Sequence, residues 1–249
     1  MDNKAQLWER FQRYVAITTQ SDPKAQTVPS TPGQFELANL LASELKEMGF
    51  VDVEVSEHAV VTSKLPSNLP AGQTAKAVGW VVHMDTVNVG LSPHIHPQMI
   101  KNYQGGDICL NKDQGIFLKT SEHPEIEQYV GDDIVVSDGT SVLGADDKSA
   151  IANVMTAMDI ITKEGRAHGD IYICFVPDEE LGEKGARKID FSKFPVDFAY
   201  TIDCCALGEV VWETFNAGSA SLFVKGVTAH PMSSKGVLVN PILVVHDFI

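Results

Sequence analysis

The chain has 249 residues, of which 44% are hydrophobic and 21% are charged, and this composition is typical of a globular protein with a sizeable core. Its formal net charge of −14 disfavours nucleic acid or an anionic membrane as a partner. No apolar run approaches the ~18 residues of a membrane span, and the first residues do not resemble a signal peptide. The four cysteines show no paired spacing, which is typical of reduced thiols, so we expect a cytoplasmic protein.

The N-terminal third predicts two helices followed by strands. Residues 4–16 place their apolar side chains on one helical face. For the second helix, Thr31 is expected as the N-cap and Pro32 as the first helical residue, with Gln34 completing a capping box. Gly49 is expected to end it. Strands are expected over residues 51–55, 60–65 and 76–83.

The middle of the chain alternates between strands and helices. Residues 88–132 are rich in Gly, Pro, His and Asn and have little periodicity, so they predict an insertion of loops and short strands. A long helix is expected over 149–164, with Gly165 as its end. Further strands are expected over residues 134–136, 170–176 and 198–203. This alternation predicts an α/β fold.

The pattern changes near Val210, where a different α+β unit is expected to begin. Residues 210–215 and 219–225 alternate like strands, and residues 237–249 begin an amphipathic helix. Because this helical pattern reaches the last residue without a cap or a breaker, we expect the sequence to be incomplete at its C-terminus.

Acidic and imidazole side chains close four apolar runs. They are His83 and Asp85, Asp146 and Asp147, Glu179 and Glu180, and Asp203. In an open α/β sheet such strand ends converge on one crevice, and so many carboxylates repel one another unless a cation joins them. One imidazole among carboxylates suits zinc or a similar ion, and the paired carboxylates suggest two metals with a shared ligand.

Each motif alone also has a simpler explanation. His83 could bind metal with Asp85 fixing its tautomer, or it could be a buried histidine satisfied by a nearby acid. Asp146 and Asp147 could be ordinary acids at a helix N-terminus. Adjacent glutamates after a strand can divide the work, one binding metal and the other taking a proton from water. Four such motifs in succession favour a metal site.

Several longer motifs resemble the peptidase T family, the tripeptide aminopeptidase branch of the co-catalytic zinc peptidases and deacylases. They are Val28-Pro29-Ser30-Thr31, His83-Met84-Asp85-Thr86, Asn102-Tyr103-Gln104-Gly105-Gly106-Asp107-Ile108, Asp138-Gly139-Thr140, Leu143-Gly144-Ala145-Asp146-Asp147-Lys148, His168-Gly169-Asp170-Ile171 and Pro177-Asp178-Glu179-Glu180. The His-x-Asp and Asp-Glu-Glu motifs are shared across the superfamily. The Val-Pro-Ser-Thr and Asn-Tyr-x-Gly-Gly-Asp motifs single out peptidase T.

The resemblance implies a fold and an activity. The expected fold is a three-layer α/β/α zinc-peptidase catalytic domain over residues 1–214, with the start of an inserted α+β lid domain over 215–249. The implied activity is removal of the N-terminal residue from tripeptides, with two zinc ions per subunit and a homodimer formed through the lid. A dipeptidase, an N-acyl-amino-acid deacylase and an inactive metal-binding fragment are the alternatives.

The resemblance also implies residue roles. The metal ligands would be His83, Asp146 as the bridge, Glu180 and Asp203. Asp85 would orient His83, Glu179 would be the general base, and the peptide between Asp146 and Asp147 would be cis. His230 would be the lid histidine that binds substrate or stabilises the oxyanion.

Some positions depart from the family pattern. Cys204-Cys205 stands where the family usually has glycines, and these thiols could be extra metal ligands or small buried residues. Met232-Ser233-Ser234 replaces the Gly-Thr-Ala of the family. His94 and His96 could form a second metal site or belong to a polar loop. The family's zinc-binding histidine near its C-terminus has no counterpart here. We therefore expect a weaker second metal, little peptidase activity and poor solubility from residues 1–249 alone.

Overall fold

The computed structural model describes every residue except 1, 204–205, 207, 215, 219 and 249. The chain forms two compact units, Met1–Cys205 and Ala206–Ile249, and each is described by itself. Among the described residues, no helix is both long and apolar enough to span a membrane.

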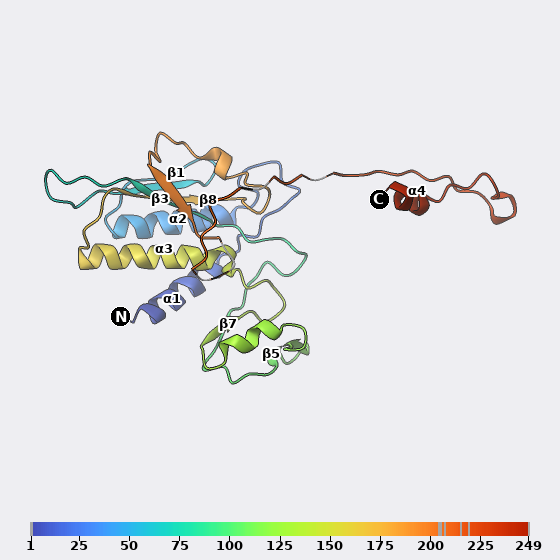
Figure 1. The fold of residues 1–249 in the computed structure, drawn as a ribbon, viewed down its shortest axis with the longest axis horizontal. Coiled ribbons are helices and arrows are strands. Elements are labelled where there is room, and N and C mark those ends of the chain that lie inside the picture. The colour runs from blue at the N-terminus through green and yellow to red at the C-terminus, as the bar shows by residue number, and fades with distance from the viewer. Residues whose placement is uncertain (1, 204–205, 207, 215, 219, 249) are drawn as a thin grey trace. The chain divides into compact units, whose positions relative to one another are not determined.

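A five-stranded mixed sheet forms the centre of the first unit (Figure 1). Its strand order is β1 (Val51–Val55), β2 (Val61–Leu65), β8 (Ile171–Val176), β3 (Val78–His83) and β9 (Phe198–Thr201). The hairpin β1–β2 joins the sheet antiparallel to β8, whereas β3 is parallel to both β8 and β9. These three parallel strands therefore end at the same edge of the sheet.

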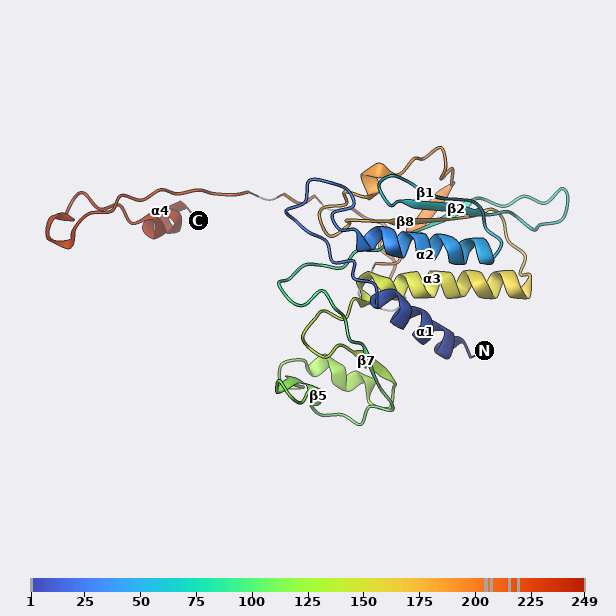
Figure 2. The ribbon, with the colours of Figure 1, turned by 180° about the vertical axis from the view of Figure 1, so that it is seen from behind.

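Three helices cover one face of the sheet (Figure 2). They are α1 (Asn3–Val15), α2 (Gly33–Glu47) and α3 (Ala145–Glu164). The apolar stripes of α2 and α3 pack directly on the strands, and α1 packs on α3. The main core between these layers is built from side chains such as Tyr14, Leu41, Ile151, Ile173 and Phe175, all of which are fully buried.

The opposite face of the sheet carries a smaller apolar cluster. Tyr172 and Cys174 of β8 point to this side and pack with Phe194, which belongs to the loop before β9. The short helix η2 (Ala186–Lys188) precedes this loop. The predicted α/β class is confirmed, and in the described residues the second covering layer is made of η2 and this loop.

The predicted insertion of loops and short strands is confirmed. It contains two separate two-stranded sheets and one 3₁₀ helix. The elements are β4 (Gln98–Ile100), β5 (Ile108–Asn111), β6 (Ile116–Leu118), η1 (Pro124–Tyr129) and β7 (Ile134–Val136). Pairing of β4 with β7 closes the insertion at its base.

The predicted capping box of the second helix is wrong. Pro32 precedes α2, which begins at Gly33, and no side chain caps its N-terminus. Gly33 is required by a close approach, because a Cβ there would lie 1.8 Å from the carbonyl oxygen of Thr18. Gln34 is fully buried and turned toward Asp178, so its side chain serves a distant loop rather than its own helix.

The second unit differs from its prediction. The expected strands over 210–215 and 219–225 are absent from the described residues of these segments, where the one antiparallel bridge nearby pairs Val227 with Val239. An alternating sequence forms a strand only when a partner takes up its backbone hydrogen bonds. The predicted C-terminal helix is confirmed as α4 (Pro241–Phe248), and a 3₁₀ turn, η3, spans Pro231–Ser233.

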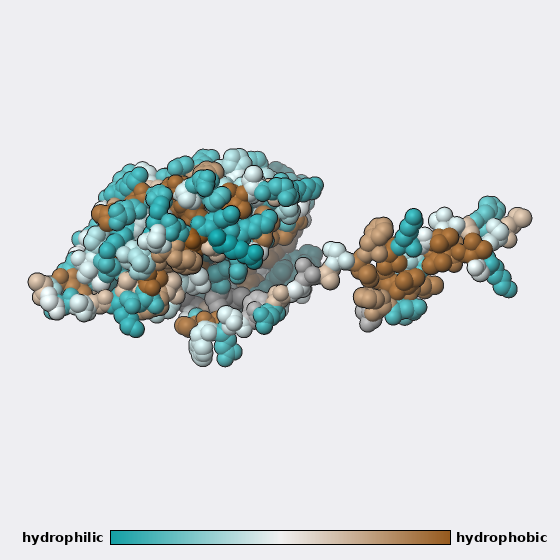
Figure 3. Space-filling view, turned by 90° about the horizontal axis from the view of Figure 1, so that it is seen from above, coloured by the Kyte–Doolittle hydropathy of each residue, from teal (hydrophilic) through white to brown (hydrophobic). Residues whose placement is uncertain are grey.

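Large apolar side chains of the second unit are exposed. Trp212, Phe223 and Met232 have exposed fractions of 84%, 90% and 93%, and hydrophobic residues gather on the face of this unit that Figure 3 shows. Exposure on this scale is unusual for an isolated globular surface.

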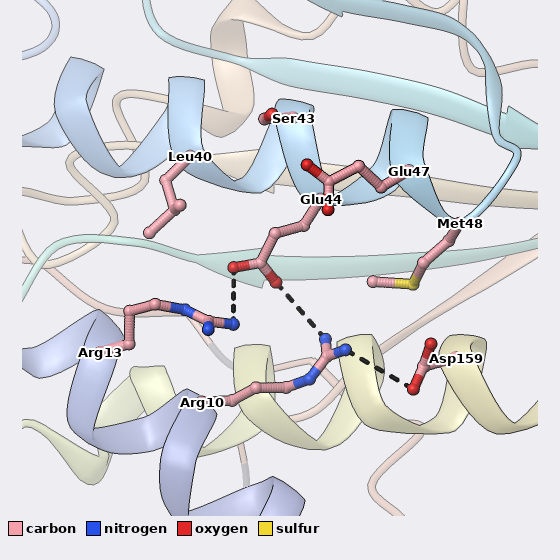
Figure 4. A pocket seen from close by; sticks show the side chains of 8 residues that line it. All are labelled: Arg10, Arg13, Leu40, Ser43, Glu44, Glu47, Met48 and Asp159. Atoms are coloured by element: carbon pink, nitrogen blue, oxygen red, sulfur yellow. Dashed lines mark hydrogen bonds and ion pairs between the residues drawn. The ribbon is translucent and has the colours of Figure 1, made fainter.

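An ion-pair network joins the three helices of the first unit (Figure 4). Arg10 of α1 lies 3.4 Å from Glu44 of α2 and 3.8 Å from Asp159 of α3, and these three side chains are only 9–12% exposed. Arg13 also contacts Glu44, at 2.8 Å, but it is 41% exposed. The network therefore has one buried arginine and one that is largely solvated.

Replacing Arg10 by methionine is expected to lower the free energy of unfolding by about 2 kcal/mol. Removing one member of a buried ion pair costs about 3–5 kcal/mol, and the loss is smaller here because Glu44 keeps Arg13 and Asp159 keeps Lys163. The same change at Arg13 should cost less than about 1 kcal/mol, because exposed pairs contribute little. Urea unfolding of both variants measures the difference, and equal losses would show that burial of Arg10 is not what matters.

Candidate metal centre

The predicted site residues of the first unit lie at or near the ends of parallel strands. His83 is the last residue of β3 and lies opposite Val176, the last residue of β8. Glu179 and Glu180 follow β8, and Asp203 follows β9. The start of α3 brings Asp146 and Asp147 to the same edge of the sheet, as their contacts with His83 show. Sequence positions 120 residues apart thus meet at one sheet edge, as expected for an open α/β fold.

His83 is buried, and both of its ring nitrogens have acidic neighbours. Nδ1 lies 3.0 Å from the backbone carbonyl oxygen of Asp85 and 3.4 Å from its carboxylate. Nε2 lies 2.9 Å from Oδ1 of Asp146 and 4.0 Å from a carboxylate oxygen of Asp203. Because Nδ1 can donate to the carbonyl, Nε2 is the ring nitrogen that could bind a metal ion, whereas without a metal it faces the carboxylate of Asp146 as a donor.

Four side chains come close enough to share an ion. One oxygen or nitrogen atom from each of His83, Asp146, Asp147 and Asp203 lies within 4.8 Å of the others. The expected cis peptide between Asp146 and Asp147 is present. Both residues have non-helical backbone angles although they lie at the start of α3, so their carboxylates leave the helix direction and join the group.

Asp85 is fully buried and ties the ends of β3 and β8 together. Its Oδ1 accepts a hydrogen bond from the backbone N–H of Glu179 at 2.9 Å, and its Oδ2 accepts one from Glu180 at 3.2 Å. One carboxylate thereby fixes both glutamates by their backbone while it also contacts the ring of His83.

Burial and mutual repulsion shift the acidic groups of the site. Burial raises the pKa of Asp147 to about 8, against the influence of the His83 charge. Burial, together with the charge of Asp146, raises the pKa of Glu180 to about 7, and burial also raises the pKa of Glu179. For His83, burial opposes the charged ring, but the contact with Asp85 and the neighbouring carboxylates raise the pKa to about 10.

The metal-free protein is expected to melt at a lower temperature at about pH 7 than at about pH 5. A carboxyl whose pKa is raised on folding stabilises the folded state below its ordinary pKa of ~4, and this contribution is lost as the pH rises through the raised value. Glu180 and Asp147 lose theirs on approaching pH values of about 7 and about 8. Burial lowers the pKa of Lys148 to about 7, so this residue makes the folded state more stable as the pH rises, but mainly above pH 7.

Thermal melts of the chelator-treated protein at both pH values measure this dependence. Asp147→Asn should flatten it, because the variant lacks one of the two titrating carboxyls. A melting temperature that rises from about pH 5 to about pH 7 in the wild type would contradict the prediction.

The donor set fits a divalent ion. One imidazole and several carboxylates are the ligands that zinc and similar ions take in proteins. Burial first, and neighbouring carboxylates second, raise the pKa of Asp147 and Glu180, and a bound cation would favour their ionised forms. Of the predicted ligands, His83, Asp146 and Asp203 lie in the four-residue group, and Asp147 joins them although the resemblance gave it no ligand role. Glu180 lies outside this group but close enough to feel the charge of Asp146.

The sequence also indicated residues outside this group. His230 belongs to the second unit, where its Nδ1 accepts a hydrogen bond from the backbone of Met232 at 3.2 Å, and its role stays a prediction. Cys204 and Cys205 lie outside the described residues. In the part of the chain that the structure describes, His94 and His96 join no group of potential ligands. The Nδ1 atom of His94 instead lies 3.3 Å from the Thr18 hydroxyl.

The sequence alone gave neither Asp178 nor Gln34 a role at this site. Both are fully buried, and the carboxylate of Asp178 accepts a hydrogen bond from the Gln34 side chain at 2.7 Å. The available signal was the position of Asp178 directly before the glutamate pair, in a motif whose other members were given roles.

The fold is shared with solved metallopeptidase-like structures. Aminopeptidase PepT of Bacillus cereus matches with a TM-score of 0.57 at 22% identity, over 82% of this chain and 44% of that chain. Aminoacylhistidine dipeptidase of Vibrio alginolyticus matches with a TM-score of 0.53 at 20% identity, over 82% of this chain and 34% of that chain. These likenesses show a shared fold, a mixed α/β sheet with helices packed on it.

Sequence comparison gives the family. No family model matches the chain. A peptidase T-like protein of Yersinia pestis is 55% identical over 98% of the chain, and a peptidase T of Geobacillus kaustophilus is 43% identical over 98%. The chain belongs to the peptidase T-like family. It spans 58% and 59% of the length of these two relatives.

Proposed function

We propose that the protein is a zinc-dependent aminopeptidase that removes the N-terminal residue from short peptides. The observation that carries this proposal is the group of His83, Asp146, Asp147 and Asp203 at the strand ends of a peptidase T-like chain. The names of similar proteins support the reaction class, since they include peptidase T and a tripeptidase of Staphylococcus aureus.

The proposed ligands are His83, Asp146, Glu180 and Asp203, with Asp146 shared between two zinc ions. Bound zinc would polarise a peptide carbonyl and make an attacking water more acidic. Asp147 is an additional candidate ligand because it lies in the same group. Asp85 is a positioning residue, since it contacts the ring of His83 and both glutamate amides.

Glu179 is the proposed general base. It follows β8 beside the ligand group, its backbone is fixed by Asp85, and burial raises its pKa. A carboxylate works best as a base when its pKa approaches the working pH. In the proposed reaction, Glu179 accepts a proton from the attacking water and passes it to the departing amine.

For the second unit, we propose a substrate contact and a dimer interface. His230 is proposed to contact the substrate or its oxyanion, and the exposed apolar side chains of residues 206–249 are proposed to pack in a homodimer. The proposed division into a catalytic domain over 1–214 and a lid beginning at 215 rests on the family resemblance. A cytoplasmic location is also proposed, on composition alone.

A substrate panel tests the reaction. The complete protein with added zinc is expected to hydrolyse Ala-Ala-Ala and to leave N-acetylated amino acids intact, because an aminopeptidase requires a free N-terminal amine. Preference for dipeptides would favour a dipeptidase, and preference for acylated substrates would favour a deacylase. Either result would contradict the proposed aminopeptidase.

A non-catalytic metal-binding protein is the second candidate. It requires only the ligand group of His83, Asp146, Asp147 and Asp203. Stoichiometric zinc binding without hydrolysis of any substrate in the panel would support it. Turnover of tripeptides would exclude it.

A further inference from the structure

Asp178 occupies an unusual position between β8 and the glutamate pair. Its side chain is fully buried, and its φ of 49° lies in the left-handed region that residues other than glycine seldom adopt. Such a conformation costs about 1 kcal/mol or more and persists only where surrounding contacts impose it. The residues that impose it here come from a distant part of the chain.

Three hydrogen bonds hold the Asp178 carboxylate. Oδ2 accepts from the backbone N–H of Ser30 at 2.6 Å, and Oδ1 accepts from the Ser30 hydroxyl at 2.5 Å and from Nε2 of Gln34 at 2.7 Å. The backbone N–H of Asp178 in turn donates to Oε1 of Gln34 at 3.0 Å. Gln34 is thus both donor and acceptor to one residue, which fixes the backbone and side chain of Asp178 together.

The other side of the same turn is held by Asp85. Its two carboxylate oxygens accept the backbone N–H groups of Glu179 and Glu180. Three consecutive residues are therefore fixed by buried partners from two directions, from β3 through Asp85 and from the start of α2 through Gln34. Neither the glutamate side chains nor a metal is needed to form these contacts.

We propose that Asp178 is a positioning residue, which acts with Ser30 and Gln34 to hold Glu179 and Glu180 in the geometry for proton transfer and metal binding. This inference rests on the proposed function for the roles of the two glutamates. Asp178 itself has its carboxylate turned to Ser30 and Gln34, so it acts through its neighbours. Partners that orient ligands in this way typically change metal affinity by about 10- to 100-fold when they are removed.

Asp178→Asn and a matched control test the inference. The substitution keeps the side-chain shape but turns an amide N–H₂ toward the donors of Ser30 and Gln34. Asp170→Asn is the control, because Asp170 lies at the opposite end of β8. Its carboxylate accepts a hydrogen bond from the backbone N–H of Ser67 and forms an ion pair with Lys64. The double variant Asp178→Asn with Gln34→Glu restores a donor opposite an acceptor and should rescue the turn.

Two measurements on the full chain are compared among these variants. Native-state amide exchange of Glu179 and Glu180 is expected to accelerate by about 10-fold or more in Asp178→Asn, to stay unchanged in Asp170→Asn and to recover in the double variant. Titration with Co²⁺, followed by its visible absorption, should give an affinity about 10-fold weaker in Asp178→Asn only. Ser30→Ala removes one of the three hydrogen bonds, so its amide exchange should be faster and its Co²⁺ affinity weaker than in the wild type, both by less than in Asp178→Asn. This variant keeps the test available if Asp178→Asn does not fold.

The outcomes separate the inference from the function beneath it. Unchanged exchange and unchanged Co²⁺ affinity in both Asp178→Asn and Ser30→Ala would overturn the role of Asp178, as would equal effects in the Asp170→Asn control. Absence of Co²⁺ binding by the wild type would overturn the proposed metal function instead, and the exchange rates would still decide whether Asp178 holds the turn.

Discussion

Replacing Glu179 by glutamine is expected to lower the rate of tripeptide hydrolysis by the complete protein by about 10²- to 10⁴-fold, the usual contribution of a general base. Glutamine has nearly the shape of glutamate but cannot accept the proton of the attacking water. The backbone contact from Glu179 to Asp85 is unaffected by the change, so zinc binding should be retained. Steady-state kinetics with Ala-Ala-Ala and zinc analysis of the same samples measure both effects.

Glu183→Gln is the matched control for this loss. Glu183 is exposed and lies four residues further along the same loop, where its backbone N–H donates to the carbonyl of Glu179. Its side chain has no proposed part in the reaction, so kcat should stay within about twofold of the wild type. Turnover by Glu179→Gln at the wild-type rate would remove Glu179 from the role of base.

His83→Ala is expected to weaken zinc binding by about 100-fold or more. Removing even an outer partner of a metal ligand costs about 10- to 100-fold, and His83 is the one imidazole in the group of potential ligands among the described residues. The remaining carboxylates suit zinc less well without a nitrogen donor. Competition with a chromophoric chelator measures the dissociation constants of both proteins.

His96→Ala serves as the control for a lost imidazole. His96 is exposed and belongs to no potential ligand group in the described part of the chain, so its variant should bind zinc as the wild type does. An equal loss in both variants would instead favour a site formed by the His94-x-His96 loop. An unchanged affinity in His83→Ala would exclude His83 as a ligand.

The sheet edge that carries the site could be predicted from the sequence because its signals are local. Most of the functional groups there lie at or shortly after the end of an apolar run that forms a strand, since His83 is the last residue of β3 and Glu179 lies three residues after β8. Parallel strands place such ends together without further information. The α/β class, the long helix and the irregular insertion followed from periodicity and turn residues in the same way.

The contacts that hold the site could not be predicted in this way because they join distant residues. Gln34 fits a capping box by spacing, but its side chain bonds to a residue 144 positions away. Asp147 is placed by a local departure from the helix that the acidic pair alone does not specify. The alternating segments after Val210 predicted strands that are absent from their described residues, because such a pattern forms a strand only if a partner strand is available.

Zinc stoichiometry tests the central claim most directly. The chain is equilibrated with zinc, dialysed against metal-free buffer, and analysed for metal and protein in the same sample. The proposed centre predicts at least one zinc ion per chain in the wild type and much less than one in His83→Ala. A wild-type chain that retains no zinc, or a His83→Ala variant that retains as much as the wild type, would contradict the proposed metal centre.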